Sequence, residues 1–179
     1  MKISKDNQFN KKLIKVDPKS KLYIVSIMNI MKDNNKAKLD EVLESISSID
    51  LKDKDGWTLL RYASNVGNIN FVNYLLSKGA NPNIQDNNGW TPLHEAVYYN
   101  KAIVEALLQA GANPNIQNRD GWTSLHCACE TGNGEIIKDL LNNNADTQIK
   151  NKNGKTPKDV AQFAFVKALI EEYEQNENN

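Results

Sequence analysis

The residues best suited to chemistry lie close together between His126 and Glu130. His126, Cys129 and Glu130 follow one another at helical spacings, so one helix face could carry an imidazole, a thiol and a carboxylate. Such a set could bind zinc or form part of a thiol-dependent enzyme. Zinc sites, however, generally take spaced pairs of ligands from separate elements. Because Cys is also a common small core residue, we expect Cys127 and Cys129 to be free, buried thiols that bind no metal.

Other candidate catalytic patterns are incomplete. Gly154-Lys155-Thr156 resembles the end of a phosphate-binding loop, but Ile149 stands where that motif requires its first glycine. His94 and His126 have no recognisable nucleophile or orienting partner beside them, which a catalytic base would need. The sequence therefore predicts a protein that is not an enzyme and has no cofactor. A metal or thiol site at His126–Cys129 remains an alternative.

Charge and hydropathy exclude further classes of protein. Lys plus Arg and Asp plus Glu number 22 each, and no long basic run occurs, so a nucleic-acid partner is not expected. No segment reaches the roughly 20 apolar residues of a membrane helix, and the N-terminus lacks the apolar core of a Sec signal peptide. We expect a cytoplasmic location, although export into a host cell by a non-Sec route would leave no readable mark.

A repeat organises most of the chain. Gly-Trp-Thr occurs at residues 56–58, 89–91 and 121–123, and Gly-Lys-Thr follows at 154–156, so the glycines lie 33, 32 and 33 residues apart. Each Thr precedes an apolar run and is suited to cap the start of a short helix. Pro92 and Pro157 then occupy the first helical position, where a missing N–H is harmless. The sequence predicts four related helix starts.

Each unit continues with a second helix. Leu pairs at 75–76, 107–108 and 140–141 lie on one helical face with the apolar residue that precedes each pair by three or four positions. Gly79 and Gly111 follow as left-handed residues that end the helix, and Asn144 takes that place in the third unit. The second unit lacks one residue between its helices. We expect its helix–turn–helix corner to differ from the others.

These motifs resemble the ankyrin repeat. Asn-Gly-Trp-Thr-Pro-Leu-His-Glu-Ala at 88–96 and Leu-Leu-Gln-Ala-Gly-Ala-Asn-Pro-Asn at 107–115 carry the resemblance. It implies an all-α solenoid of helix–turn–helix units joined by extended, β-hairpin-like fingers. We expect a polar extension over 1–19, a degenerate N-terminal capping repeat over 20–52, ankyrin repeats over 53–85, 86–117 and 118–150, and a truncated C-terminal capping repeat over 151–175. It also implies that His94 and His126 tie finger to helix.

The resemblance also implies a concave groove that binds a partner protein. Trp57, Trp90 and Trp122 follow the finger glycine in successive units, and helices stacked about 8–10 Å apart would make them a ladder of rings. Tryptophan is a frequent hot-spot residue of protein interfaces. The other interpretation is that each ring packs along the next finger and supports the stack. Both interpretations stay open at this point.

Aromatic and charged residues of the first helices extend the expected site. Tyr98 and Tyr99 end the first helix of the second unit, Glu130 has the equivalent place in the third, and Arg61 and Tyr62 lie in the first. One of the two neighbouring tyrosines could instead pack inward, where the residue is missing.

We expect a non-catalytic module that is monomeric when free and binds an unidentified protein through its groove and fingers. Self-association through the three tryptophans is the alternative.

Overall fold

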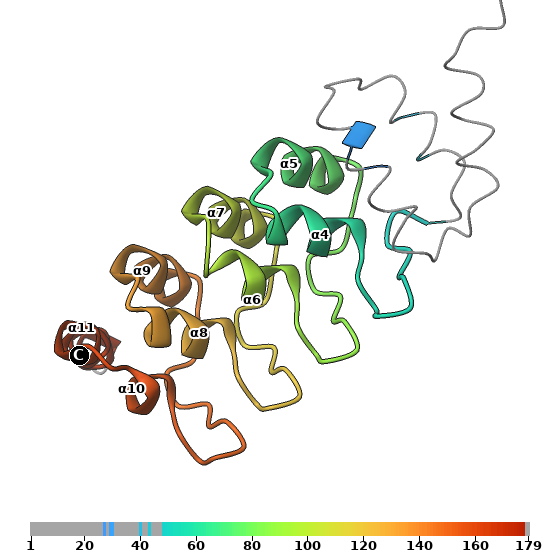
Figure 1. Ribbon diagram of the computed structural model, residues 1–179. Helices are drawn as coiled ribbons and strands as arrows, with labels where there is room; N and C mark the ends of the chain where they lie inside the picture. Colours follow the sequence, from blue (N-terminus) through green and yellow to red (C-terminus); the bar gives the residue numbers. More distant parts are fainter. Residues whose placement is uncertain (1–26, 28, 31–39, 41–42, 44–47, 178–179) are drawn as a thin grey trace, which may run out of the picture.

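The computed structural model describes residues 27, 29–30, 40, 43 and 48–177 of the 179-residue chain. The predicted extension over 1–19 and most of the predicted capping repeat over 20–52 lie outside these residues. Four helix pairs follow one another, labelled as in Figure 1. They are α4 (Leu59–Asn65) and α5 (Ile69–Ser77), α6 (Pro92–Ala96) and α7 (Lys101–Gln109), α8 (Ser124–Thr131) and α9 (Gly134–Asn142), and α10 (Pro157–Val160) and α11 (Ala164–Glu177).

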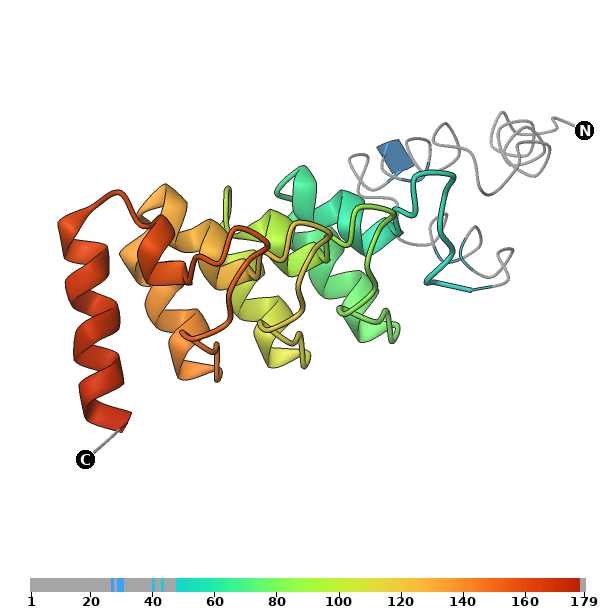
Figure 2. The same ribbon diagram turned by 90° about the horizontal axis from the view of Figure 1, so that it is seen from below.

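The helix pairs stack as two layers. The first helices α4, α6, α8 and α10 contact one another in order, and α5, α7, α9 and α11 form the second layer (Figures 1 and 2). Equivalent leucines of the first helices, Leu60, Leu93 and Leu125, are buried between the layers. No helix pair can cover its apolar face alone, so each is stabilised by its neighbours. Within the described residues the fold is all-α, as predicted, because no strand is formed.

Helix ends follow the local sequence. Thr58, Thr91, Thr123 and Thr156 all cap first helices with their side chains, which confirms the prediction. The second helices have caps that sequence reasoning missed. Asn68, Asn100 and Asn133 each accept a backbone N–H three residues later, for example from Ile103. At the other ends Gly79, Gly111 and Asn144 have positive φ, as predicted.

The missing residue of the second unit shortens its first helix. α6 has 5 residues, whereas α8 has 8. The chain turns through Val97 to Tyr99 instead of continuing the helix, and Asn100 then starts α7 in extended conformation. The second unit therefore has the irregular corner that its missing residue predicts, and Tyr98 and Tyr99 lie in that turn.

Each finger is a hairpin-like turn that forms no strand in the described residues, and a backbone bond closes it; before α6, Asp86 N donates to Trp90 O at 2.8 Å. In the finger before α6, Asp86 Oδ1 accepts the backbone N–H groups of Asn88 (2.8 Å) and Trp90 (2.9 Å). Asp53, Asn118 and Asn151 repeat this arrangement. A side-chain oxygen thus accepts two backbone N–H groups of the turn, in addition to the backbone bond that closes it.

Successive fingers are joined by backbone hydrogen bonds. Arg119 N donates to Asn88 O at 2.8 Å, and equivalent bonds join the fingers on either side. This close approach needs Gly89, whose φ is +81° and where an added Cβ would lie 2.8 Å from Arg119 N.

A second joint lies at the C-terminal ends of the second helices. Asn83 donates to Gly111 O (3.0 Å) and accepts from Asn113 N (2.7 Å). Asn115 makes the same two bonds to Asn144 O (2.8 Å) and Asp146 N (2.8 Å) one unit later. The same donor and acceptor pairs therefore recur from one joint to the next.

The C-terminal pair closes the described stack. α10 has only 4 residues, whereas α11 has 14 and continues to Glu177. Tyr173 of α11 donates to Leu141 O at 3.0 Å, which holds the helix on α9. Of the helices in the described part, none is both long and apolar enough to span a bilayer.

Candidate protein-binding groove

The two histidines serve as joints between units. His94 Nδ1 lies 2.8 Å from Thr91 Oγ1, and Nε2 lies 3.0 Å from the carbonyl oxygen of Trp122 in the next unit. A carbonyl can only accept, so Nε2 carries the proton. Burial lowers the pKa of His94 to about 4, so the ring is neutral near pH 7. His126 makes the same contacts with Thr123 and Lys155.

The cysteines are core residues. Cys127 and Cys129 are free and fully buried, and burial raises the pKa of each thiol to about 12. A protonated, enclosed thiol is neither a good nucleophile nor a metal ligand. In the described part of the chain, no group of three His, Cys, Asp or Glu side chains is arranged to hold a metal ion. The geometry at 126–130 therefore gives no support to the alternative of a metal or thiol site.

The three tryptophans are half-buried, and each packs first against its own helix. Trp57 lies on Tyr62 with ring centroids 4.6 Å apart, Trp90 on His94 at 5.6 Å, and Trp122 on His126 at 5.7 Å. Successive tryptophans make no ring contact with one another. Part of each indole therefore supports its own unit, as one of the two interpretations of the sequence anticipated.

Arg61 and Tyr62 lie inside the protein and not on the expected contact surface. They are 4% and 6% exposed. The Tyr62 hydroxyl donates to Asp53 at 2.8 Å, and its pKa is raised, first by burial and then by that carboxylate. Arg61 pairs with Glu95 (2.7 Å) and Asp86 (3.6 Å). Arg61 holds the first two units together, because Asp86 and Glu95 belong to the second unit, whereas Tyr62 ties α4 to the finger of its own unit.

Tyr98 and Tyr99 have separate surroundings. Tyr99 is 66% exposed. Tyr98 is half-buried and has its ring centroid 6.1 Å from that of Trp90. Burial raises the pKa of Tyr98, so it stays a neutral phenol. One tyrosine thus packs inward, as one interpretation of the sequence anticipated, and the other faces solvent.

The structure brings several expected residues together in one open pocket. This pocket, called the groove pocket below, has a volume of about 420 Å³. Its lining combines aromatic rings with charged and amide side chains: Trp90, Tyr98, Asn118, Asp120, Trp122, Glu130, Lys152 and Asn153. The sequence predicted contact through the fingers in general, but it did not single out the four finger residues among them. The types of these residues alone gave no sign of a binding site. They reach the pocket only because the next finger folds over the first helices.

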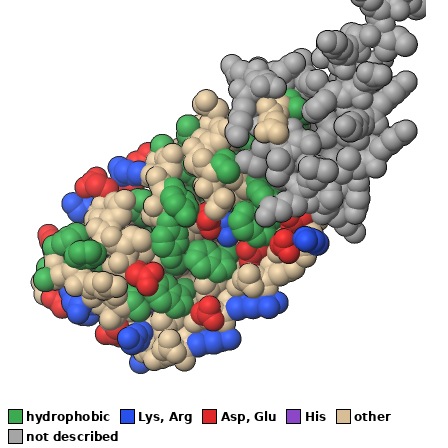
Figure 3. Space-filling view, in the orientation of Figure 1, with side chains coloured by type: hydrophobic (Ala, Val, Ile, Leu, Met, Phe, Trp, Pro, Cys, Tyr) green, Lys and Arg blue, Asp and Glu red, His purple; other side chains and the backbone are tan. Residues whose placement is uncertain are grey.

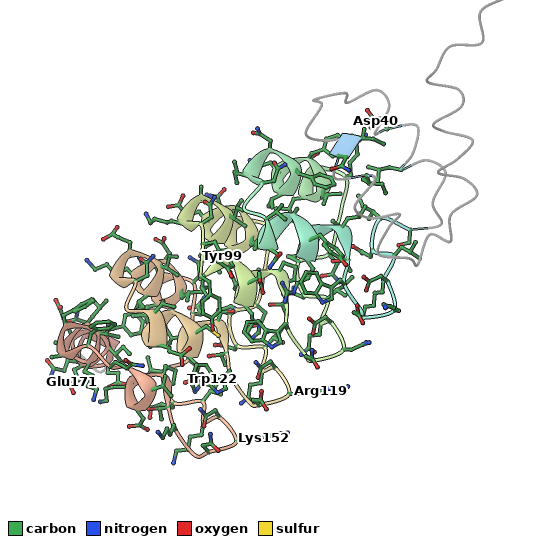
Figure 4. All side chains as sticks on the ribbon, in the orientation of Figure 1. Asp40, Tyr99, Arg119, Trp122, Lys152 and Glu171 are labelled. Atoms are coloured by element: carbon green, nitrogen blue, oxygen red, sulfur yellow. The ribbon has the colours of Figure 1, made fainter. Side chains whose placement is uncertain are left out.

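Figure 3 shows how polar and apolar groups are distributed on this face. Hydrophobic side chains gather over the first helices, and basic side chains follow the edge that carries the fingers. Figure 4 shows Trp122 between Tyr99 on one side and the fingertip residues Arg119 and Lys152 on the other. The face combines aromatic rings and both signs of charge, which is the composition of many protein interfaces.

Comparisons with known proteins agree with this architecture. A family model described as ankyrin repeats (3 copies) matches residues 27–118 and 98–179. A Rickettsia bellii protein named as an ankyrin repeat protein is 40% identical over 62 residues, which are 35% of this chain and 18% of that protein. Human ankyrin repeat and SOCS box protein 3 is 45% identical over 38 residues, 21% of this chain and 7% of that protein.

The matched segments thus span less than a fifth of these relatives. Ankyrin repeats are in general non-catalytic modules that bind other proteins. The family matches together cover residues 27–179, which include all the helix pairs and fingers described above. The chain belongs to the ankyrin-repeat family.

Proposed function

We propose that this chain binds a partner protein in its groove, and that the groove pocket between the second and third units is the centre of the contact. The observation that carries the proposal is the grouping of Trp90, Tyr98 and Trp122 around an opening to solvent. A few residues supply most of the binding energy of a protein interface, and Trp and Tyr are enriched among them. Packing within the units uses part of each ring and leaves the rest for a partner.

The titratable groups favour binding over catalysis. His94 is neutral and hydrogen-bonded through both ring nitrogens, and Cys127 and Cys129 are enclosed thiols. Exposed charges such as Glu130 and Lys152 line the pocket at its surface. Charges in such positions select a partner and increase the rate of association.

The proposal is tested by affinity capture with matched surface variants. Tyr99→Ala removes a 66% exposed ring beside the pocket, and Phe165→Ala removes a 55% exposed ring at the C-terminal end of the stack. Both variants should have the circular dichroism spectrum of the wild type and the same midpoint of urea unfolding. We expect wild type and Phe165→Ala to retain one common protein that Tyr99→Ala and Glu130→Lys lose. Equal retention by all four chains would place the contact outside the groove.

Trp90→Ala is a less suitable variant for this assay. Trp90 contacts His94 and Tyr98, and Arg61 lies 5.9 Å from its ring, so truncation would also loosen the stack. Loss of capture by that variant could reflect unfolding, whereas Tyr99 and Glu130 have no such role.

Self-association is the second candidate and has one specific observation in its favour. Phe163 and Phe165 are 45% and 55% exposed, with ring centroids 5.8 Å apart. Their position suggests contact at the C-terminal end and not through the tryptophans. A mass that rises with concentration in analytical ultracentrifugation, and no longer rises in Phe163→Ser with Phe165→Ser, would support this candidate. A constant monomer mass would exclude it.

A further inference from the structure

The chain itself shows what fits between two successive groove tryptophans. The guanidinium carbon of Arg61 lies 4.3 Å from the ring centroid of Trp57 and 5.9 Å from that of Trp90. The carboxylates of Glu95 and Asp86 neutralise the cation at 2.7 Å and 3.6 Å. The space between the first and second tryptophans is therefore filled by a guanidinium that contacts indole rings and carboxylates.

The equivalent space one unit later has no buried guanidinium from the described part of the chain. His94 has the place of Arg61 in the second unit, but its ring is bound to Thr91 and to Trp122 O and is neutral. The space between Trp90 and Trp122 is the groove pocket. It therefore has the two indole rings of the Arg61 site and lacks the guanidinium.

Carboxylates are also present in this pocket, although they come from other positions in the repeat. Asp120 belongs to a finger and Glu130 to the end of α8, and both are exposed. Neither forms an ion pair with any residue that the structure describes. Lys152 on the opposite wall reduces the charge of the lining to a net −1, but it is exposed and its flexible stem can turn outward.

We propose that the groove pocket binds the guanidinium of an arginine side chain supplied by the partner protein. This inference rests on the proposed function and names the partner group that enters the pocket. Guanidinium is planar and weakly hydrated, so it can lie on indole faces while its N–H groups reach carboxylates. A volume of about 420 Å³ accommodates the guanidinium and its three-carbon stem.

The test uses the full-length protein and a short peptide, acetyl-Gly-Arg-Gly-amide. The 3 tryptophans give 3 separate indole N–H signals in nitrogen-15 NMR spectra, which Trp→Phe variants assign. We expect the peptide to shift the Trp90 and Trp122 signals saturably, with a Kd on the order of millimolar for such a small ligand. The Trp57 signal should stay in place, because its ring is already covered by Arg61.

Matched ligands and variants separate arginine recognition from general affinity. The citrulline peptide has the same shape without the charge and should bind at least about tenfold more weakly. Glu130→Gln should weaken arginine binding several-fold, and Lys152→Ala should strengthen it. Both positions are exposed, so these variants keep the fold. Equal binding of the citrulline peptide, or no shift of Trp90 and Trp122 at tens of millimolar peptide, would overturn the inference.

The two proposals fail in different ways. If Tyr99→Ala loses a partner that wild type captures but the arginine peptide does not bind, the groove is a contact surface and the arginine inference is wrong. If the peptide binds as described while Tyr99→Ala and Glu130→Lys capture the same proteins as wild type, the pocket accepts guanidinium but the proposed function is wrong.

Discussion

Replacement of Arg61 by methionine tests whether a buried cation holds the first two units together. The Arg61, Asp86 and Glu95 side chains are 5%, 2% and 12% exposed, so solvent screens their interaction weakly. Arg61→Met keeps most of the apolar stem and removes the charge. Two carboxylates are then left in a buried place without their cation.

The expected loss of stability follows from that burial. Removal of one partner of a buried ion pair costs about 3–5 kcal/mol. Asp86 keeps the backbone N–H groups of Asn88 and Trp90, so the lower part of that range, about 3 kcal/mol, is expected here. With an m-value of about 2–3 kcal/mol/M, the urea midpoint should fall by roughly 1–1.5 M.

The assay is urea unfolding followed by circular dichroism, with Lys101→Met as the matched control. Lys101 also pairs with more than one carboxylate, including Glu105 at 3.0 Å, but its side chain is 42% exposed. We expect that control to leave the midpoint almost unchanged. Glu95→Gln in the Arg61→Met background should recover part of the loss. Equal, small shifts for Arg61→Met and Lys101→Met would refute the reasoning.

Other predictions concern buried groups and finger geometry. The pKa of His94 is about 4 in the folded chain and 6.5 in the unfolded chain. The neutral ring therefore makes its full contribution to the free energy of unfolding above pH 6.5, and about 3 kcal/mol of it is lost as the pH drops toward 4. Urea titrations across that range should show a steeper loss for wild type than for His94→Gln, and parallel curves would contradict this. Burial raises the pKa of both cysteine thiols to about 12, so at about pH 8 Ellman's reagent should react with neither until urea unfolds the chain. Fast reaction with the native protein would show that Cys127 or Cys129 is accessible. In Gly111→Ala the new Cβ meets no atom within 4 Å, so the positive φ alone should lower the stability of the fold by about 1–2 kcal/mol. Gly89→Ala also places a Cβ 2.8 Å from Arg119 N and should lower the stability clearly more. Equal losses in thermal unfolding would mean that the finger contact contributes nothing.

Features that depend on a few neighbouring residues could be predicted from the sequence. The caps at Thr91 and Thr123, and the left-handed positions at Gly111 and Asn144, each need only residues within the same turn. The repeat spacing then placed these turns in register, which fixed the fold. The irregular second unit was also visible, because a missing residue changes the spacing directly.

Features that depend on residues brought together by stacking could not be predicted. Arg61 appeared to be a groove residue, since Asp86 and Glu95 lie 25 and 34 positions away and meet it only when two units stack. The same reason hid Asp120 and Lys152 from the expected site. Sequence spacing places a side chain on a helix face, but whether that side chain is buried depends on which side chains of the next unit pack on that face.

The recurring joints also have a consequence for how such a chain can change in length. Asn83 bonds to Gly111 and Asn113 as Asn115 bonds to Asn144 and Asp146. A duplication or an excision of the second unit in the gene would therefore leave an Asn side chain facing a backbone carbonyl acceptor at the new junction. Recombination can lengthen or shorten the stack by whole units, and the groove would gain or lose one binding position each time.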